Sequence, residues 1–448
     1  MKYIFFCTAI LAILPGTVIL LCRRPWIRWA MLGLNLPLVM FNTTSINFFS
    51  HEFYRGTSRG MEISLIYLVA LIILLTFALL KRSKTFLPDW GSVLYLLYFF
   101  LSLPSLARSE NLLFSFFELW KMAMIYLVYL TVYQYLEYTK GDFDILLYGI
   151  MIVVGVNFIV VVVQHLIGYY QVPGTFPHQN SMAMYMQLAG MLFFARYFNL
   201  REKRKGLLFL FFFALASASL LRTYSRGAIA CYPIAGLLTL FLSVWHRFNL
   251  RKVYITLFLV FLGLVGLALF LPRIIERFEK APESSGQTRK EFAIAAINMM
   301  KDHPLTGVGI NNWGIKINPP YPYSKHREDR HYKEDYKDGI VETIYLLVGA
   351  ECGIPCLTVL ILWFGYYWFT AFFLLRPLRK SPLFYVPAGA LGGMTGIFMQ
   401  SCLEWVLKQQ INFLLLVTVF AMIGYLNRHR KELLAAAKMQ SRPQKERT

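Results

Sequence analysis

Two arginines, Arg222 and Arg226, stand four residues apart in the short sequence Arg-Thr-Tyr-Ser-Arg-Gly, between two long apolar segments. Neither segment, 206–221 or 227–244, carries a charged residue. A guanidinium group held at the edge of an apolar environment is unfavourable unless it meets an anion, and its planar fork suits the oxygens of a phosphate. The spacing therefore predicts an anion-binding turn at a membrane boundary, where the natural anion is a lipid phosphate.

Membrane-spanning helices must position this turn, because apolar stretches make up most of the chain. Of the 448 residues 57% are hydrophobic and only 15% are charged. Many stretches reach the length of about 20 residues that a helix needs to cross the hydrocarbon layer. The sequence therefore predicts an all-α polytopic membrane protein with about 12–13 transmembrane helices and one large periplasmic loop. The candidate spans are 3–21, 29–41, 61–80, 92–107, 122–137, 145–167, 181–197, 206–221, 227–245, 253–271, 343–375, 383–401 and 411–427.

Two of these spans are irregular. The stretch 29–41 is short, and 343–375 is expected to combine a periplasmic half-helix with a true span, because Gly353 and Pro355 interrupt it. The predicted parts of the chain are an N-terminal transmembrane bundle (1–271), a large periplasmic loop with an amphipathic helix (272–342), C-terminal transmembrane helices (343–427) and a basic cytoplasmic tail (428–448).

The distribution of positive charge predicts which ends of the spans share a membrane side. Seven alternate connections hold 25 of the 45 lysines and arginines, whereas the N-terminus and the short connections on the other side hold 8. By the positive-inside rule the first set is cytoplasmic, so the Arg222–Arg226 turn and the segment 272–340 face outward. The net charge of +21 then reflects topology and lipid contact, and it does not require a nucleic-acid partner. The seven connections are 22–28, 81–88, 138–144, 196–205, 246–252, 376–380 and the tail from 428.

The segment 272–340 is the one long polar stretch, so soluble chemistry is expected there or at the outer ends of the spans. Within it the pattern predicts an amphipathic helix that opens next to Arg289, continues to Met300 and is ended by His303-Pro304. The apolar positions of this helix are Phe292, Ala295, Ala296 and Met299.

Other short patterns in this region do not predict a metal site or a nucleotide site. The turn that begins Gly307-Val-Gly309 lacks the third glycine and the flanking strand of a GxGxxG motif. His326 and His331 lie in a charged stretch, predicted to be a solvated loop, without a defined third ligand. Cys352 and Cys356 are spaced as metal ligands can be, but with no histidine or second cysteine pair nearby they are expected to be buried thiols. We expect no metal and no cofactor.

Glu342 stands where the polar segment meets apolar sequence, on the same predicted side as the two arginines. A carboxylate at a half-desolvated boundary tends toward a raised pKa, and it can act as a base or pair with an arginine. The alternative is an acid that stabilises the first turn of the next helix through the helix dipole. Glu351 and Glu404 are similar candidates.

Four blocks of the sequence, taken in order over roughly residues 170–425, resemble the O-antigen ligase and O-antigen polymerase superfamily. They are Phe176-Pro-His178-Gln-Asn180, then Thr223-Tyr-Ser225-Arg226-Gly227-Ala228, then Arg289 opening a helix that runs to Asp302-His-Pro304-Leu-Thr-Gly307-Val-Gly309, then Ile344-Tyr-Leu-Leu-Val-Gly-Ala-Glu351-Cys-Gly353-Ile-Pro355.

The resemblance implies a metal-independent, membrane-embedded glycosyltransferase of the bacterial inner membrane, with its active site facing the periplasm. Such an enzyme takes a glycan from undecaprenyl pyrophosphate and joins it to an acceptor, which is lipid A-core for a ligase or a growing chain for a polymerase. The two functional arginines of the family fall on Arg226 and Arg289, where the inferred role is binding of the donor pyrophosphate. This role fits the bidentate fork of arginine, because a pyrophosphate leaving group gains negative charge.

The chain departs from the family at one position. Ligases of this family usually carry a histidine at the start of the block that ends in Glu-x-Gly, and this chain has Glu342 there. We infer that Glu342 replaces this histidine near the acceptor hydroxyl, which makes it the third catalytic candidate. The further residues expected to bind substrate are Arg222, Ser225, His178, Asn180 and Glu404.

Two other classes of protein compete with this interpretation. A polysaccharide transporter also has many spans and intramembrane charges, but transporters tend to carry charges at mid-span and to show internal repeats, and no repeat is found here. A structural or assembly protein leaves Arg222, Arg226 and Arg289 without a role. The sequence therefore favours an enzyme, either a ligase or a polymerase.

Overall fold

The computed structural model describes most of the chain. The described residues are 2–40, 44–51, 54–81, 86–200, 202–246, 283–324, 339–379 and 381–432, together with scattered residues between 249 and 268. Three predicted features lie wholly or largely outside them. These are the span 253–271, the charged loop with His326 and His331, and the tail beyond 432.

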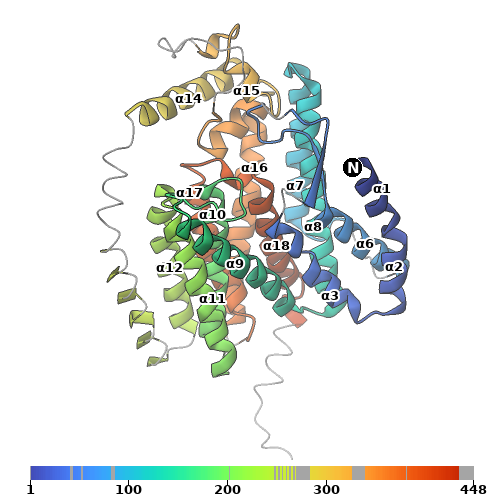
Figure 1. Cartoon of the computed structure of the whole chain (residues 1–448), viewed down its shortest axis with the longest axis vertical. Coiled ribbons are helices and arrows are strands. Elements are labelled where there is room, and N and C mark those ends of the chain that lie inside the picture. The colour runs from blue at the N-terminus through green and yellow to red at the C-terminus, as the bar shows by residue number, and fades with distance from the viewer. Residues whose placement is uncertain are drawn as a thin grey trace, which may run out of the picture.

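Long helices dominate the described residues, and seven of these helices are long and apolar enough to cross a membrane (Figure 1). The prediction of a polytopic membrane protein is therefore confirmed. The seven are Trp90–Arg108, which joins α7 (Trp90–Ser102) to the 3-10 helix η1 (Leu103–Arg108), α8 (Leu112–Thr139), α9 (Phe143–Leu166), α11 (Lys203–Arg222), α12 (Arg226–His246), α16 (Ile344–Leu378) and α18 (Gln410–Arg428).

Further helices complete the bundle, and two predicted spans are broken into pieces. The stretch 3–21 forms two helices and the stretch 29–41 forms two more, because Pro15 and Pro37 cannot donate the backbone hydrogen bonds that would continue the helix before them. The remaining helices are α1 (Lys2–Leu11), α2 (Ile13–Cys22), α3 (Trp26–Gly33), α4 (Leu36–Val39), α6 (Leu65–Leu79), α10 (Gln179–Asn199) and α17 (Tyr385–Gln400).

Helix α10 is surrounded by α11, α12 and α17, and nearly all of its side chains are buried. Glycines let α17 approach it closely. A Cβ atom at Gly389 would lie 2.9 Å from Leu192 Cα, and one at Gly393 would lie 2.5 Å from Leu188 Cδ1. Small residues commonly permit such close packing between transmembrane helices. This tight group holds α12, and with it Arg226, in a fixed position.

Polar contacts join the connections that were predicted to share one membrane side. Arg28 lies 2.7 Å from Asp142, and Arg196 lies 2.7 Å from Asp144. Further contacts at this end link Arg196 to the carbonyl of Pro382, Arg379 to the carbonyl of Trp245 and Arg428 to the carbonyl of Pro88. The predicted cytoplasmic connections therefore gather at one end of the bundle, whereas α14 and α15 lie at the other end (Figure 1).

A layer of further elements covers that second end. It contains α14 (Glu283–Asp302), α15 (Trp313–Lys316) and the 3-10 helix η2 (Pro322–Ser324). It also contains two short antiparallel strands that the sequence analysis did not predict, β1 (Ser45–Phe48) and β2 (Met61–Ser64), with Ser45 opposite Ser64. The strands pair because the long connection after α4 must satisfy its own backbone hydrogen-bonding groups.

Helix α16 is broken at Gly353, as predicted, where φ is 84° and ψ is 172°. The break interrupts the helical hydrogen bonds, and the backbone of 304–309 supplies partners at this place. The turn at 307–309 approaches so closely that a Cβ atom at Gly307 would lie 2.4 Å from the Glu351 carbonyl. The three bonds across this contact are Val308 N–H to Ala350 O at 2.9 Å, Gly309 N–H to Glu351 O at 3.0 Å and Ile354 N–H to Pro304 O at 2.8 Å. The outer layer is thus fastened to the outer part of α16.

We predict that Gly353→Ala destabilises the protein. Its backbone conformation is nearly restricted to glycine, which corresponds to about 1–3 kcal/mol of strain for another residue, and the new Cβ atom would lie 2.6 Å from the Leu305 carbonyl. The unfolding temperature of the purified protein in detergent should fall by several degrees. Gly365→Ala in the same helix is the control, because its Cβ atom meets nothing closer than 4.0 Å. Equal unfolding temperatures for the two variants would contradict this account.

Candidate functional site

Hydroxyl groups shape the turn between α11 and α12. Thr223 Oγ1 donates a hydrogen bond to the Leu220 carbonyl at 2.6 Å and accepts one from Ser225 N–H at 3.1 Å. Ser225 Oγ in turn accepts a hydrogen bond from Ala228 N–H at 3.4 Å. These bonds end α11 and begin α12 at Arg226, so that Arg226 stands at the N-terminal end of α12, where the helix dipole also favours an anion.

Helix α14 carries the second arginine. Its predicted apolar face is confirmed, because Phe292, Ala295, Ala296 and Met299 are buried in one cluster with Trp313. The helix begins at Glu283, however, and not next to Arg289. No proline interrupts the helix between 283 and 289, so Arg289 lies inside it. The buried face holds α14 against the outer part of α16.

Arg289 and Glu342 meet where α14 passes the start of α16. Arg289 Nη2 lies 3.6 Å from Glu342 Oε2, and the two side chains are 40% and 39% exposed. Burial raises the pKa of Glu342, and the positive charges of Arg289 and then Arg226 partly oppose this shift. Glu342 is therefore close to both arginines while it stays accessible from outside the bundle.

Glu404 lies beside this group and is almost fully buried, with 4% exposure. Ser225 Oγ donates to its Oε1 at 3.3 Å, and Gln400 Nε2 donates to its Oε2 at 3.0 Å. Burial raises the pKa of Glu404 to about 7; the negative charge of Glu342 adds to this shift, whereas the two hydrogen bonds and Arg289 oppose it. We call Ser225, Arg226, Arg289, Glu342 and Glu404 the candidate site.

The other predicted site residues make different contacts. Arg222 Nη1 donates to Tyr224 Oη at 3.1 Å, and its Nη2 contacts His165 Nδ1 at the end of α9. His178 precedes α10 and caps it, because its Nδ1 accepts a hydrogen bond from Asn180 N–H at 3.2 Å. In the described contacts, Arg222 thus meets α9 and the α11–α12 turn, whereas His178 and Asn180 meet each other at the start of α10.

A group of buried charges that the sequence analysis did not identify lies at the same end of the bundle. Lys408 Nζ is 3.3 Å from Glu118 Oε1 and 3.1 Å from Glu351 Oε2, and Lys121 Nζ is 2.7 Å from Glu118 Oε2. We call these four residues the buried charge network. Glu351, which the sequence offered as a candidate acid, is engaged in this network and also accepts a hydrogen bond from the backbone of Trp313.

Possible metal ligands are not clustered in the described part of the chain, where no three of the His, Cys, Asp and Glu side chains come together to hold an ion. Cys352 and Cys356 are buried free thiols, as predicted. Cys356 Sγ lies 3.3 Å from Ser102 Oγ.

Comparison with protein families identifies a domain in this part of the chain. Residues 209–361 match the family described as O-antigen ligase. The matched segment contains Arg226, Arg289 and Glu342, which the structure brings together from three separate elements. A search of curated proteins found no match. The resemblance inferred from the sequence blocks is therefore confirmed over residues 209–361.

We predict that Glu404→Gln becomes more stable relative to the wild type as the pH rises. The folded protein holds the Glu404 proton to about pH 7, whereas the ordinary pKa is 4.5, so ionisation of Glu404 destabilises the folded state across this window. Glutamine cannot ionise. The free energy of unfolding of Glu404→Gln minus that of the wild type should increase by about 1–3 kcal/mol between pH 5 and pH 8. Unfolding temperatures across this range test the prediction, with the exposed Glu202→Gln as control. A difference that does not change with pH would contradict it.

Proposed function

We propose that the protein transfers a glycan from a lipid pyrophosphate to an acceptor hydroxyl, because residues 209–361 match the O-antigen ligase family and the chain is a polytopic membrane protein. In this proposal the donor glycan is linked to undecaprenyl pyrophosphate and the acceptor is lipid A-core. The observation that carries the proposal is the meeting of two arginines and two carboxylates, from four separate segments, at one end of the bundle.

The arginines are proposed to bind the donor pyrophosphate. When the bond between the anomeric carbon and the phosphate oxygen breaks, negative charge develops on the departing pyrophosphate. Arg226 and Arg289 offer fixed cations for this charge, and their forks can donate two hydrogen bonds each. A buried Glu404 that keeps its proton near neutral pH reduces the negative charge that the phosphate would otherwise meet.

Glu342 is proposed to act on the acceptor. The acceptor oxygen forms the new bond to the anomeric carbon, undecaprenyl pyrophosphate leaves, and the hydroxyl proton passes to the Glu342 carboxylate. A half-exposed position supports this role, because an incoming acceptor can reach the side chain. Its raised pKa supports the role further, because a base is most effective when its pKa approaches the working pH.

The reaction is proposed to take place at the periplasmic face of the bacterial inner membrane. The candidate site lies at the end of the bundle opposite the connections that hold 25 of the 45 lysines and arginines. Positively charged connections remain on the cytoplasmic side during insertion. Lipid-linked glycans that have crossed the membrane would then meet the site on its outer side.

A polymerase of the same superfamily is the second candidate, because Glu342 stands where ligases usually carry a histidine. The two activities share the donor and differ in the acceptor. Purified protein given a lipid-linked repeat unit alone should leave the donor unchanged if it is a ligase, whereas a polymerase should form a ladder of longer lipid-linked chains.

We predict that Arg226→Ala and Arg289→Ala each lower kcat/KM for glycan transfer by about 10²–10³-fold, because each removes charge stabilisation of the leaving group. Lysine at either position should restore activity only in part, since it offers a point charge without the fork. Lys290→Ala, an exposed cation next to Arg289 in the same helix, should keep wild-type activity. Transfer at the wild-type rate by both alanine variants would refute the pyrophosphate role.

We predict that Glu342→Gln lowers kcat by about 10²–10⁴-fold with little change in donor binding, because it keeps the shape of the side chain and removes the base. Glu342→His should retain part of the activity. Transfer of radiolabelled glycan and binding of undecaprenyl pyrophosphate are measured separately, with the exposed Glu110→Gln as control. If glutamine supports full activity at every pH, Glu342 is a helix-end acid and the base lies elsewhere, with Glu404 the next candidate.

A further inference from the structure

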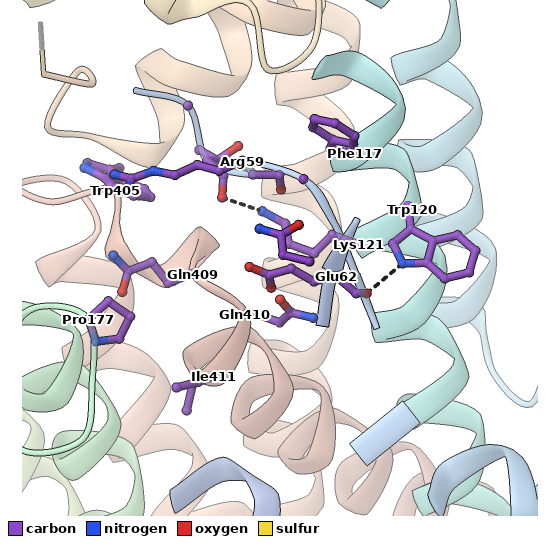
Figure 2. Close-up of a pocket in the computed structure, with 15 residues that line it drawn as sticks. Arg59, Glu62, Phe117, Trp120, Lys121, Pro177, Trp405, Gln409, Gln410 and Ile411 are labelled. Atoms are coloured by element: carbon purple, nitrogen blue, oxygen red, sulfur yellow. Dashed lines mark hydrogen bonds between the residues drawn. The ribbon is translucent and has the colours of Figure 1, made fainter. Parts of the chain in front are cut away.

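A pocket of about 300 Å³ is lined in part by Trp405, the residue that follows Glu404 of the candidate site (Figure 2). Its walls come from the strand pair β1–β2 and the connection between them, from α8, and from the segment that joins η3 (Val406–Lys408) to α18. Figure 2 shows Glu62, Trp120 and Lys121 on one side of the pocket and Trp405, Gln409 and Pro177 on the other. The volume is at the lower end for small-molecule sites, which suits one small ring-shaped unit.

Three buried polar atoms in the pocket wall have no hydrogen-bond partner among the described residues. They are Asn47 Oδ1, Gln409 Oε1 and Gln410 Nε2. Gln410 as a whole is only 8% exposed. Buried polar groups are nearly always hydrogen-bonded, so two acceptors and one donor on residues that line the same pocket favour a ligand with hydroxyl groups, which both donate and accept.

Aromatic side chains provide the apolar part of the wall. Phe117, Trp120 and Trp405 line the pocket, and the ring of Trp120 is held in place because its Nε1–H donates to the Glu62 carbonyl at 2.8 Å. Flat apolar rings beside unpartnered amides fit a molecule with C–H groups on its faces and hydroxyl groups at its edge. A sugar ring has this character.

The charges of the pocket favour a neutral sugar. Lys121 is paired with Glu118 at 2.7 Å, so its charge is already balanced. Arg59 and Glu62 both line the pocket and have opposite signs. A free anion would meet the Glu62 carboxylate, and a free cation would meet Arg59. A hydroxyl group, in contrast, can bond to either of them.

The pocket adjoins the candidate site through one short segment. Glu404 belongs to the candidate site, and the next residue, Trp405, lines the pocket. Trp405 also packs against the cluster that contains Phe292 of α14, the helix that carries Arg289. The Trp405 side chain therefore belongs both to the pocket wall and to the packing that supports the helix of Arg289.

We propose that this pocket binds a neutral sugar ring of a glycan substrate and so fixes the position of that glycan next to the candidate site. The inference rests on the proposed function, because a glycan must belong to the donor, to the acceptor or to both. The shared chemistry is the sugar ring, and the experiment below separates the two sources.

The test uses two variants of the full-length protein in detergent, Gln410→Leu in the pocket and Gln187→Leu as the matched control. Gln187 is a buried glutamine of α10 whose amide atoms also have no partner among the described residues, but it does not line the pocket. Replacing an unpartnered amide by leucine should leave the unfolding temperature unchanged or higher in both variants. A loss of binding in Gln410→Leu alone is then not a consequence of unfolding.

Three probes are titrated by calorimetry. Two are oligosaccharides without their lipid, the O-chain of the donor and the core of the acceptor. The third is undecaprenyl pyrophosphate, the donor lipid without its sugar. We expect one oligosaccharide to bind at least tenfold more weakly to Gln410→Leu than to the wild type and to Gln187→Leu. Binding of the O-chain identifies the donor as the source, and binding of the core identifies the acceptor. Equal oligosaccharide binding by all three proteins, or no oligosaccharide binding by the wild type, would overturn the inference.

Undecaprenyl pyrophosphate separates this inference from the proposed function. We expect Gln410→Leu to bind it as the wild type does, and Arg289→Ala to bind it weakly. Weaker binding of the sugar-free lipid by Gln410→Leu would show that the pocket belongs to the lipid site and would also overturn the inference. If Arg289→Ala binds this lipid as well as the wild type does, the pyrophosphate role of Arg289 is refuted. The sugar-binding role of the pocket is not affected by that result, because it is tested by oligosaccharide binding.

Discussion

The arrangement of the outer end depends on a lysine buried between two glutamates. Lys408, which is 2% exposed, contacts Glu118 of α8 and Glu351 of α16. Burial lowers the pKa of Lys408, but the two carboxylates more than offset this effect and the pKa is raised. Because a buried charge without its partner is strongly destabilising, arrangements of α8, α16 and η3 that separate Lys408 from its glutamates are disfavoured. The network thus fixes three distant segments at one point.

The segment around Lys408 carries this constraint to its neighbours. Glu404 lies four residues before Lys408 and reaches Ser225, whereas Gln409 and Gln410 follow it and line the pocket. The candidate site and the pocket are therefore positioned by the same buried charge. Asn311 strengthens the arrangement from outside, since its amide donates to the carbonyls of Ser58 and Phe114, each at 2.8 Å.

Features that depend on local sequence could be predicted, and features that depend on distant contacts could not. The buried face of α14 and the break at Gly353 follow from periodicity and from backbone preference, so both were predicted correctly. The spacing of Arg222 and Arg226 did not reveal that they make different contacts. Tyr224 between them has a positive φ of 49°, so the two arginines do not share one helix face, and Arg222 contacts His165. Gln409 and Gln410 are adjacent polar residues at the start of α18, a pattern that gives no sign of a pocket.

The break at Gly353 also separates the part of α16 that must match the membrane from the part that need not. From Ile354 to Leu378 the helix rises about 37 Å at 1.5 Å per residue, which is already enough to cross a hydrocarbon layer of about 30 Å. The residues before the break are fastened to the outer layer by backbone hydrogen bonds. A thicker or thinner bilayer would then be accommodated by tilting of the inner part. Glu342, which precedes the outer part, would keep its place beside Arg289.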